Sequence, residues 1–157
     1  MRIGIIVYSK TGNTYRVAKE LKEELEKKGH TVNLERLNVE ESSNGKDFSL
    51  GGIPEVETYD RLIFASPVHA FSLAPPMEAF LKKISSLEGK KSFCFVTKQL
   101  PFYWTGGNRA ITQMTKICSE KGAEIQSGEI VIWGSKKREE NIKTCVQNLS
   151  RAVSREE

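Results

Sequence analysis

Short apolar runs alternate with amphipathic helical patterns along nearly the whole chain. The apolar runs predict strands over residues 2–8, 31–37, 61–65, 91–97 and 123–133. Apolar residues at helical spacing predict helices over residues 13–28, 75–84, 109–121 and 138–153. Strands and helices that alternate in this way form a parallel sheet with helices on both faces. The sequence therefore predicts an α/β fold, built as a three-layer sandwich.

The length and composition indicate one domain over residues 1–157. The chain is 38% hydrophobic and 28% charged, and no apolar stretch approaches the roughly 20 residues that a membrane helix needs. We expect no membrane span, and because a strand begins at residue 2 we expect no signal peptide. The cysteines form no pair that suggests a disulfide, so we expect a cytoplasmic protein. The net charge of +4 comes from basic residues interleaved with acidic ones, so no nucleic-acid partner is expected. A monomer is favoured.

The cysteine and histidine residues do not indicate a metal site. Cys94, Cys118 and Cys145 are far apart in the sequence and form no CxxC pair, so we expect buried, reduced thiols. His69 has no second histidine, cysteine or carboxylate at metal-ligand spacing. No bound metal is therefore predicted.

Residues 38–58 are punctuated by serine, asparagine, glycine and proline, and no helical stripe survives between them. A loop of this length inside a compact domain is uncommon and is often functional or poorly ordered. We expect mostly coil here, with at most one short helical turn.

The first strand runs directly into a hydroxyl-rich loop, Ser9-Lys10-Thr11-Gly12-Asn13-Thr14, and a helix follows at once. The free N–H groups of a first helical turn and its partial positive charge make such a loop a natural anion site. The same residue types also serve as ordinary turn and capping residues. Taken alone, the loop favours phosphate binding only modestly.

Two further loops follow the carboxyl ends of predicted strands, where parallel sheets bind their ligands. The loop of residues 66–75 contains His69 and Phe71, and the loop of residues 97–108 contains three consecutive aromatic residues, 102–104. Exposed aromatic clusters are costly in water unless they cover something, so a phosphate site beside them suits a phosphorylated planar ligand. The alternative is that these side chains pack only against their own loop and helix.

In these loops the chain resembles the flavodoxin family. The stretch Ser9 to Thr14 matches the family's phosphate-loop pattern of hydroxyl, any residue, Thr, Gly, any residue, Thr. The run Ser66-Pro67-Val68-His69-Ala70, followed by Pro75-Pro76, is similar to the family's second flavin loop. The run Gly106-Gly107-Asn108-Arg109-Ala110 is similar to the end of its third loop, and the last strand has no long insertion, as in short-chain members.

The resemblance implies a five-stranded parallel sheet of order 2-1-3-4-5, non-covalent FMN, and electron transfer through the flavin. It also implies redox partner proteins, a reductase or ferredoxin-type donors and acceptors, whose identity stays open. The residues implied at the phosphate are Ser9, Lys10, Thr11, Gly12, Asn13 and Thr14, with the Lys10 side chain facing solvent. Those implied around the isoalloxazine ring are Pro67, Val68, His69, Ala70, Phe71, Thr97, Lys98, Tyr103, Gly106 and Gly107.

Two features depart from the family pattern. Flavodoxins are usually acidic, whereas this chain carries a net charge of +4. Many members have a glycine-containing turn in the second loop, and its peptide reorients toward the reduced flavin. This chain has His69-Ala70-Phe71 there, and Ala70 is expected to resist the positive φ that glycine tolerates.

Other open α/β sheets would require residues that this chain lacks. The first loop has neither a GxGxxG run nor a cysteine nucleophile, and no acidic residues end the first and third strands. Three functions remain open: an electron carrier, a small FMN-dependent NAD(P)H oxidoreductase acting on quinones or similar acceptors, and a flavin-free interaction module. The carrier is favoured because the chain is short and shows no extra segment for a nicotinamide.

Overall fold

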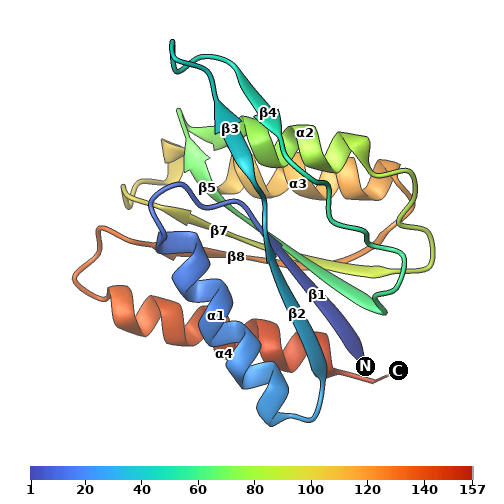
Figure 1. Ribbon diagram of the computed structural model, residues 1–157. Helices are drawn as coiled ribbons and strands as arrows, with labels where there is room; N and C mark the ends of the chain where they lie inside the picture. Colours follow the sequence, from blue (N-terminus) through green and yellow to red (C-terminus); the bar gives the residue numbers. More distant parts are fainter. Residues whose placement is uncertain (157) are drawn as a thin grey trace.

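The computed structural model describes residues 1–156 and places one parallel sheet between two pairs of helices (Figure 1). Its five parallel strands lie in the order β2-β1-β5-β7-β8. They are β1 (Arg2–Val7), β2 (Thr31–Arg36), β5 (Arg61–His69), β7 (Lys91–Lys98) and β8 (Glu124–Ile132). Numbered along the chain, this is the order 2-1-3-4-5, so the predicted α/β flavodoxin-like topology is confirmed.

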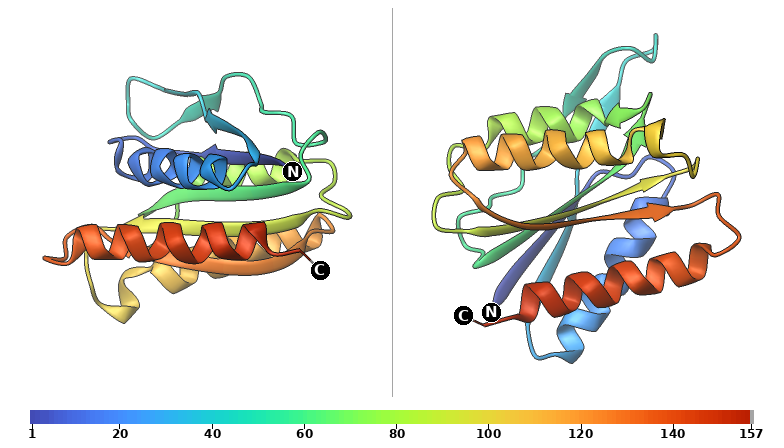
Figure 2. Two further views of the ribbon diagram at one scale, coloured as in Figure 1. Left: turned by 90° about the horizontal axis from the view of Figure 1, so that it is seen from below. Right: turned by 180° about the vertical axis from the view of Figure 1, so that it is seen from behind.

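The helices cover both faces of the sheet in pairs. Figure 2 shows α1 (Asn13–Lys27) and α4 (Arg138–Ser154) on one face, and α2 (Pro75–Lys83) and α3 (Gly107–Glu120) on the other. Among the described residues no helix is long and apolar enough to cross a membrane.

Each face of the sheet contributes to a separate apolar core. Successive residues of a strand point to opposite faces, so Ile5 packs with the α1 and α4 side chains while Ile6 packs with those of α2 and α3. This is why β1 and β5 consist of nearly uninterrupted apolar residues rather than alternating ones. Both faces are buried.

The three cysteines are buried thiols, as predicted. Cys94 lies on β7, Cys118 on α3 and Cys145 on α4. Burial raises the pKa of Cys94 and of Cys118 to about 12, and it raises the pKa of Cys145 as well. No cluster of metal-ligating side chains occurs within the part of the chain that the structure describes.

Residues 38–58 are mostly coil, as expected, but they contain one short hairpin that was not predicted. β3 (Val39–Glu41) and β4 (Phe48–Leu50) form a short antiparallel hairpin. Val39 and Leu50 pair with each other and pack against the core on the α2 side. Strands of three residues are too short to produce a recognisable period, so the sequence pattern could not predict them.

The third parallel strand is longer than predicted, because β5 continues past residue 65 to His69. The pairing of β5 with β1 ends at Ala65, whereas its pairing with β7 continues to Pro67. A proline is tolerated there because no strand remains on the β1 side to need its N–H group. The strand then folds back, and Val68 and His69 pair with β6 (Ser72–Leu73).

Candidate functional site

The carboxyl ends of β1, β5 and β7 meet at one edge of the sheet, and the three predicted loops come together there (Figure 1). The ring of Tyr8, after β1, contacts the ring of His69 edge-on, with centroids 5.8 Å apart. A Cβ placed on Gly106 in the third loop would lie 2.4–2.5 Å from backbone atoms of Phe71 in the second. The structure therefore brings the second loop into contact with both of the others.

The first loop is folded around the side chain of Ser9. The buried Ser9 hydroxyl accepts hydrogen bonds from the N–H groups of Gly12 (3.1 Å) and Tyr15 (3.2 Å). The guanidinium group of Arg36, at the end of β2, donates through Nε (3.1 Å) and Nη2 to the Ser9 carbonyl. The Ser9 hydroxyl therefore stabilises the loop through contacts within it, and Arg36 stabilises it from the neighbouring strand β2.

At least three backbone donors of the first loop remain available to a ligand near the start of α1. Within the described part of the chain, the N–H groups of Thr11, Asn13 and Thr14 donate to no carbonyl and to no side chain. Gly12 has φ +99°, and the space that a Cβ would occupy there is open. The first turn of α1 contains no acidic residue. The loop therefore fits a phosphate group, with free amides at a helix N-terminus and no nearby carboxylate on that turn.

The threonine side chains of this loop have different surroundings. The Thr14 side chain is buried, and its hydroxyl lies 2.7 Å from the hydroxyl of Thr97 on β7. The Thr11 side chain is exposed. Lys10 is also exposed and pairs with Glu41 of the β3 strand at 3.2 Å, so it faces solvent as expected. The Thr11 side chain is thus accessible to a ligand, whereas the Thr14 hydroxyl links the loop to the sheet through its contact with Thr97.

The second loop is a tight hairpin between His69 and Ser72. Its two central residues, Ala70 and Phe71, both have positive φ, 48° and 62°. Two positive φ angles in a two-residue hairpin are the mark of a type I′ turn, whose twist matches the flanking strands. The expectation that Ala70 resists such a conformation is therefore wrong. The left-handed conformation costs roughly 1–2 kcal/mol per residue, and contacts such as that between the Leu73 N–H and Gln113 Oε1 (2.8 Å) hold the hairpin in place.

The third loop is tied around the side chain of Lys98. The Lys98 ammonium group donates to the carbonyl of Phe102 (2.9 Å) and to the hydroxyl of Thr105 (3.2 Å). The Thr105 hydroxyl also lies within hydrogen-bond distance of the Leu100 and Phe102 carbonyls. Lys98 is only 7% exposed, and this burial lowers its pKa.

The aromatic residues of the two loops form an exposed cluster. Trp104 contacts Phe71 edge-on at 5.6 Å and lies parallel to Phe102 at 5.8 Å. Trp104 is 66% exposed and Tyr103, in the short helical turn η1 (Tyr103–Thr105), is 83% exposed. Phe102 and Trp104 therefore pack partly within their own loop, as the alternative interpretation held, whereas Tyr103 does not.

A planar ring between the second and third loops would have to displace the contact between Phe71 and Trp104. The hollow between these loops measures about 120 Å³. Its lining residues are Val68, Ala70, Phe71, Lys98, Gln99, Leu100 and Thr105. Phe71 is 48% exposed and Trp104 is 66% exposed, so both rings lie at the surface, where side chains change rotamer within nanoseconds. The first loop thus fits the phosphate of FMN as it stands, whereas the hollow between the second and third loops would have to widen to take the ring.

The remaining predicted residues lie at the same edge. Thr97 is buried at the end of β7, Pro67 and Val68 are half-buried on β5, and Gly107 begins α3 beside Lys98. Sequence reasoning missed Tyr8 and Arg36. The available signal was position, since both stand at the carboxyl end of a predicted strand next to the phosphate loop.

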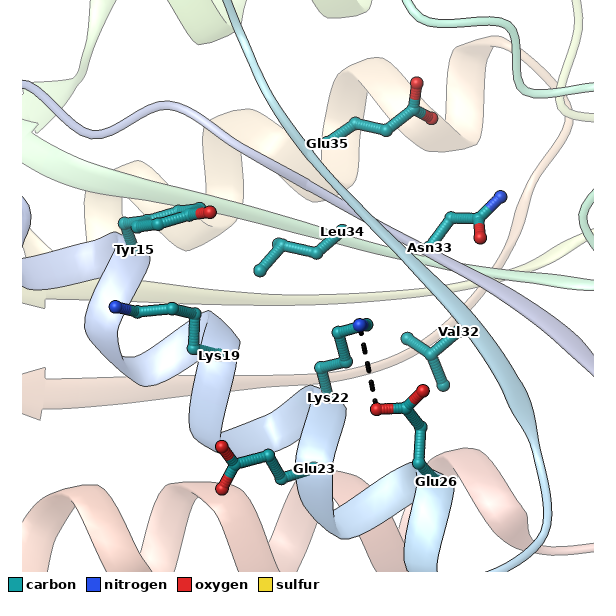
Figure 3. Close-up of a pocket in the computed structure, with 9 residues that line it drawn as sticks. All are labelled: Tyr15, Lys19, Lys22, Glu23, Glu26, Val32, Asn33, Leu34 and Glu35. Atoms are coloured by element: carbon teal, nitrogen blue, oxygen red, sulfur yellow. Dashed lines mark ion pairs between the residues drawn. The ribbon is translucent and has the colours of Figure 1, made fainter.

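A larger hollow lies elsewhere on the surface. It measures about 670 Å³ and runs between α1 and the edge strand β2 (Figure 3). Charged side chains dominate its lining, among them Lys19, Glu23 and the ion pair between Lys22 and Glu26. A solvated charged groove of this kind has few of the apolar walls that small-molecule sites use. The loop edge is therefore the better candidate site despite its smaller hollow.

Comparisons with known proteins show the family of the chain. A family model for the flavodoxin domain matches residues 4–101, more than half of the chain. No curated protein matches the chain significantly.

Solved structures with the same fold include three flavodoxins. The oxidised flavodoxin 2 of Bacillus cereus is 24% identical, with a TM-score of 0.73 and 98% of each chain covered. Flavodoxin 1 of the same organism is 19% identical, with a TM-score of 0.73 and 100% of each chain covered. A Fusobacterium nucleatum flavodoxin bound to flavin mononucleotide is 15% identical, with a TM-score of 0.64 and 96% and 97% of the two chains covered. By the match of the family model, the chain belongs to the flavodoxin domain family.

Proposed function

We propose that this protein binds FMN non-covalently at the carboxyl edge of its sheet and carries electrons between redox partner proteins. The observation that carries the proposal is the first loop, where three N–H groups without a partner in the described chain stand at the N-terminus of α1. A phosphate accepts such donors strongly. When bound, FMN supplies reversible electron transfer, and the protein supplies its binding and electrostatic environment.

The chain's own residues divide into two groups under this proposal. The N–H groups of Thr11, Asn13 and Thr14, with the Thr11 hydroxyl, hold the phosphate. Ser9 and Arg36 keep the loop in shape. The second group flanks the ring: Pro67, Val68, His69, Ala70 and Phe71 on one side, and Thr97, Lys98, Tyr103, Gly106 and Gly107 on the other.

The form of the ring site favours a carrier over an oxidoreductase. Enzyme pockets for small molecules commonly measure about 300–1,000 Å³ and enclose most of the ligand. The space between the second and third loops is bordered instead by the exposed side chains of Phe71, Tyr103 and Trp104. A flavin held there lies near the surface, within reach of a partner protein.

The test is a titration of the purified protein with FMN, followed by anaerobic reduction. A carrier forms a yellow 1:1 complex that NADH and NADPH alone do not bleach, and that a partner reductase does reduce. Rapid bleaching by NADH or NADPH without a partner would overturn the carrier in favour of the oxidoreductase. Failure to bind FMN at all would overturn both in favour of a flavin-free interaction module.

A further inference from the structure

Lys98 is a buried cation without a matching anion. Its side chain is 7% exposed, and its ammonium group contacts a carbonyl and a hydroxyl. Within the described residues no carboxylate lies within 4.0 Å of it. A buried charge without a counter-ion is rare in proteins and usually has a functional reason.

The surroundings of Lys98 add further positive charge. Residues 61–77 and 92–119, which include the second and third loops, contain no aspartate and no glutamate. A Cβ on Gly107 would lie 3.2 Å from Lys98 Cδ, so the N-terminus of α3 lies against the lysine stem. That helix end carries partial positive charge, has no acidic residue in its first turn and includes Arg109.

Among the residues that the structure describes, Lys98 is the only charged one that lines the hollow between the second and third loops. A ring held between these loops therefore meets one buried positive charge and no negative one from the lining. Two-electron reduction of the FMN ring takes up two electrons and one proton at neutral pH, which leaves one negative charge on the ring. A nearby cation in a partly desolvated site stabilises that charge and has a much smaller effect on the neutral oxidised ring.

We propose that Lys98 binds the reduced, anionic flavin ring in preference to the oxidised ring, and so raises the reduction potential of the bound FMN. This inference rests on the proposed function. It assigns to one residue an effect opposite to that of the acidic surroundings usual in flavodoxins. Lys98 also holds the third loop through the Phe102 carbonyl, so its charge must be separated experimentally from its hydrogen bonds.

The variant for this purpose is Lys98→Gln, whose amide still donates hydrogen bonds but carries no charge. Lys98→Arg keeps the charge, and Arg109→Gln removes one exposed positive charge nearby as the matched control. For each protein, the dissociation constant of oxidised FMN is measured by fluorescence, and the potential by anaerobic titration with dithionite as the electron donor. These two values, with the reduction potential of free FMN measured in the same buffer, give the dissociation constant of reduced FMN.

Lys98→Gln is expected to weaken binding of reduced FMN at least tenfold more than binding of oxidised FMN, which lowers the potential by about 30 mV or more. Lys98→Arg is expected to keep the ratio of the dissociation constants of reduced and oxidised FMN near that of the wild type. Arg109→Gln is expected to change this ratio less than about threefold, because solvent screens the charge of Arg109. If Lys98→Gln weakens the binding of reduced and oxidised FMN equally, or abolishes the binding of oxidised FMN, then Lys98 only holds the third loop in place. Either result would overturn the inference. Failure of the wild-type protein to bind FMN would instead overturn the proposed function.

Discussion

The hydroxyl groups of Thr14 and Thr97 lie 2.7 Å apart in a buried contact between residues 83 positions apart in the sequence. Thr14 stands in the first turn of α1 and Thr97 near the carboxyl end of β7. The contact fastens the phosphate loop to the strand that leads into the third loop. It fixes the distance between the two ends of the proposed FMN site.

Replacing either threonine by valine is expected to destabilise the protein by about 1–2 kcal/mol, because the remaining hydroxyl is left buried without its partner. The double variant Thr14→Val with Thr97→Val is expected to cost clearly less than the sum of the two single variants, since it leaves no orphaned hydroxyl. Urea unfolding of the four proteins measures the free energies. Additive effects would show that the two hydroxyls do not depend on each other.

Gly106 is expected to be far more sensitive to substitution than Gly29. Both have strongly positive φ, 99° and 91°, so alanine costs about 1 kcal/mol of strain at either position. At Gly29 nothing lies within 4 Å of an added Cβ, whereas at Gly106 it would meet the Phe71 backbone at 2.4 Å. Gly106→Ala should therefore lower the free energy of unfolding by at least about 1–3 kcal/mol more than Gly29→Ala. Similar losses in the two variants would contradict the close packing of the second and third loops.

The sequence predicted the sheet because its strands are buried on both faces. β1 from Ile3 onward and the centre of β7, residues 93–96, are continuous apolar runs. Helical stripes such as Val17, Leu21 and Leu25 are regular over several turns. The hairpin of β3 and β4 was not predicted because its strands have three residues each and none of these residues is fully buried. Its position is decided by the contact of Val39 and Leu50 with the core, which is tertiary information.

The candidate site was predictable as a set of loops but not in its internal contacts. Strand order places residues 9–14, 66–75 and 97–108 at one edge. No sequence pattern shows that the hydroxyl of Thr14 faces Thr97 or that Arg36 bonds the Ser9 carbonyl. The conformation of Ala70 was mispredicted because residue preference alone opposed it, whereas the twist of the hairpin required it.

Stability is expected to fall as the pH drops from about 7.5 to 5.5. Burial lowers the pKa of His30 below 6.5, and the positive charge of the nearby N-terminal amino group lowers it further. Burial also lowers the pKa of His69, and the positive charge of Lys10 adds to that effect. The folded state therefore favours the neutral imidazoles, while the unfolded chain takes up protons as the pH falls through about 6.5. The unfolded state then binds more protons, so the free energy of unfolding decreases on acidification.

Urea unfolding at several pH values measures this slope in the wild type and in the double variant His30→Gln with His69→Gln. The variant is expected to lose most of the slope over this window. A wild-type stability that stays constant or rises on acidification would contradict the assigned pKa directions.

The central claim is that the first loop anchors a flavin through its phosphate. It is tested most directly by titrating the flavin-free protein with FMN and with riboflavin, which has the same ring and no phosphate. Three amide donors to a phosphate at a helix N-terminus are worth at least about 2.7 kcal/mol, or a hundredfold in affinity. We predict that FMN binds 1:1 and at least about a hundredfold more tightly than riboflavin; equal affinities, or no binding of FMN, would contradict the account.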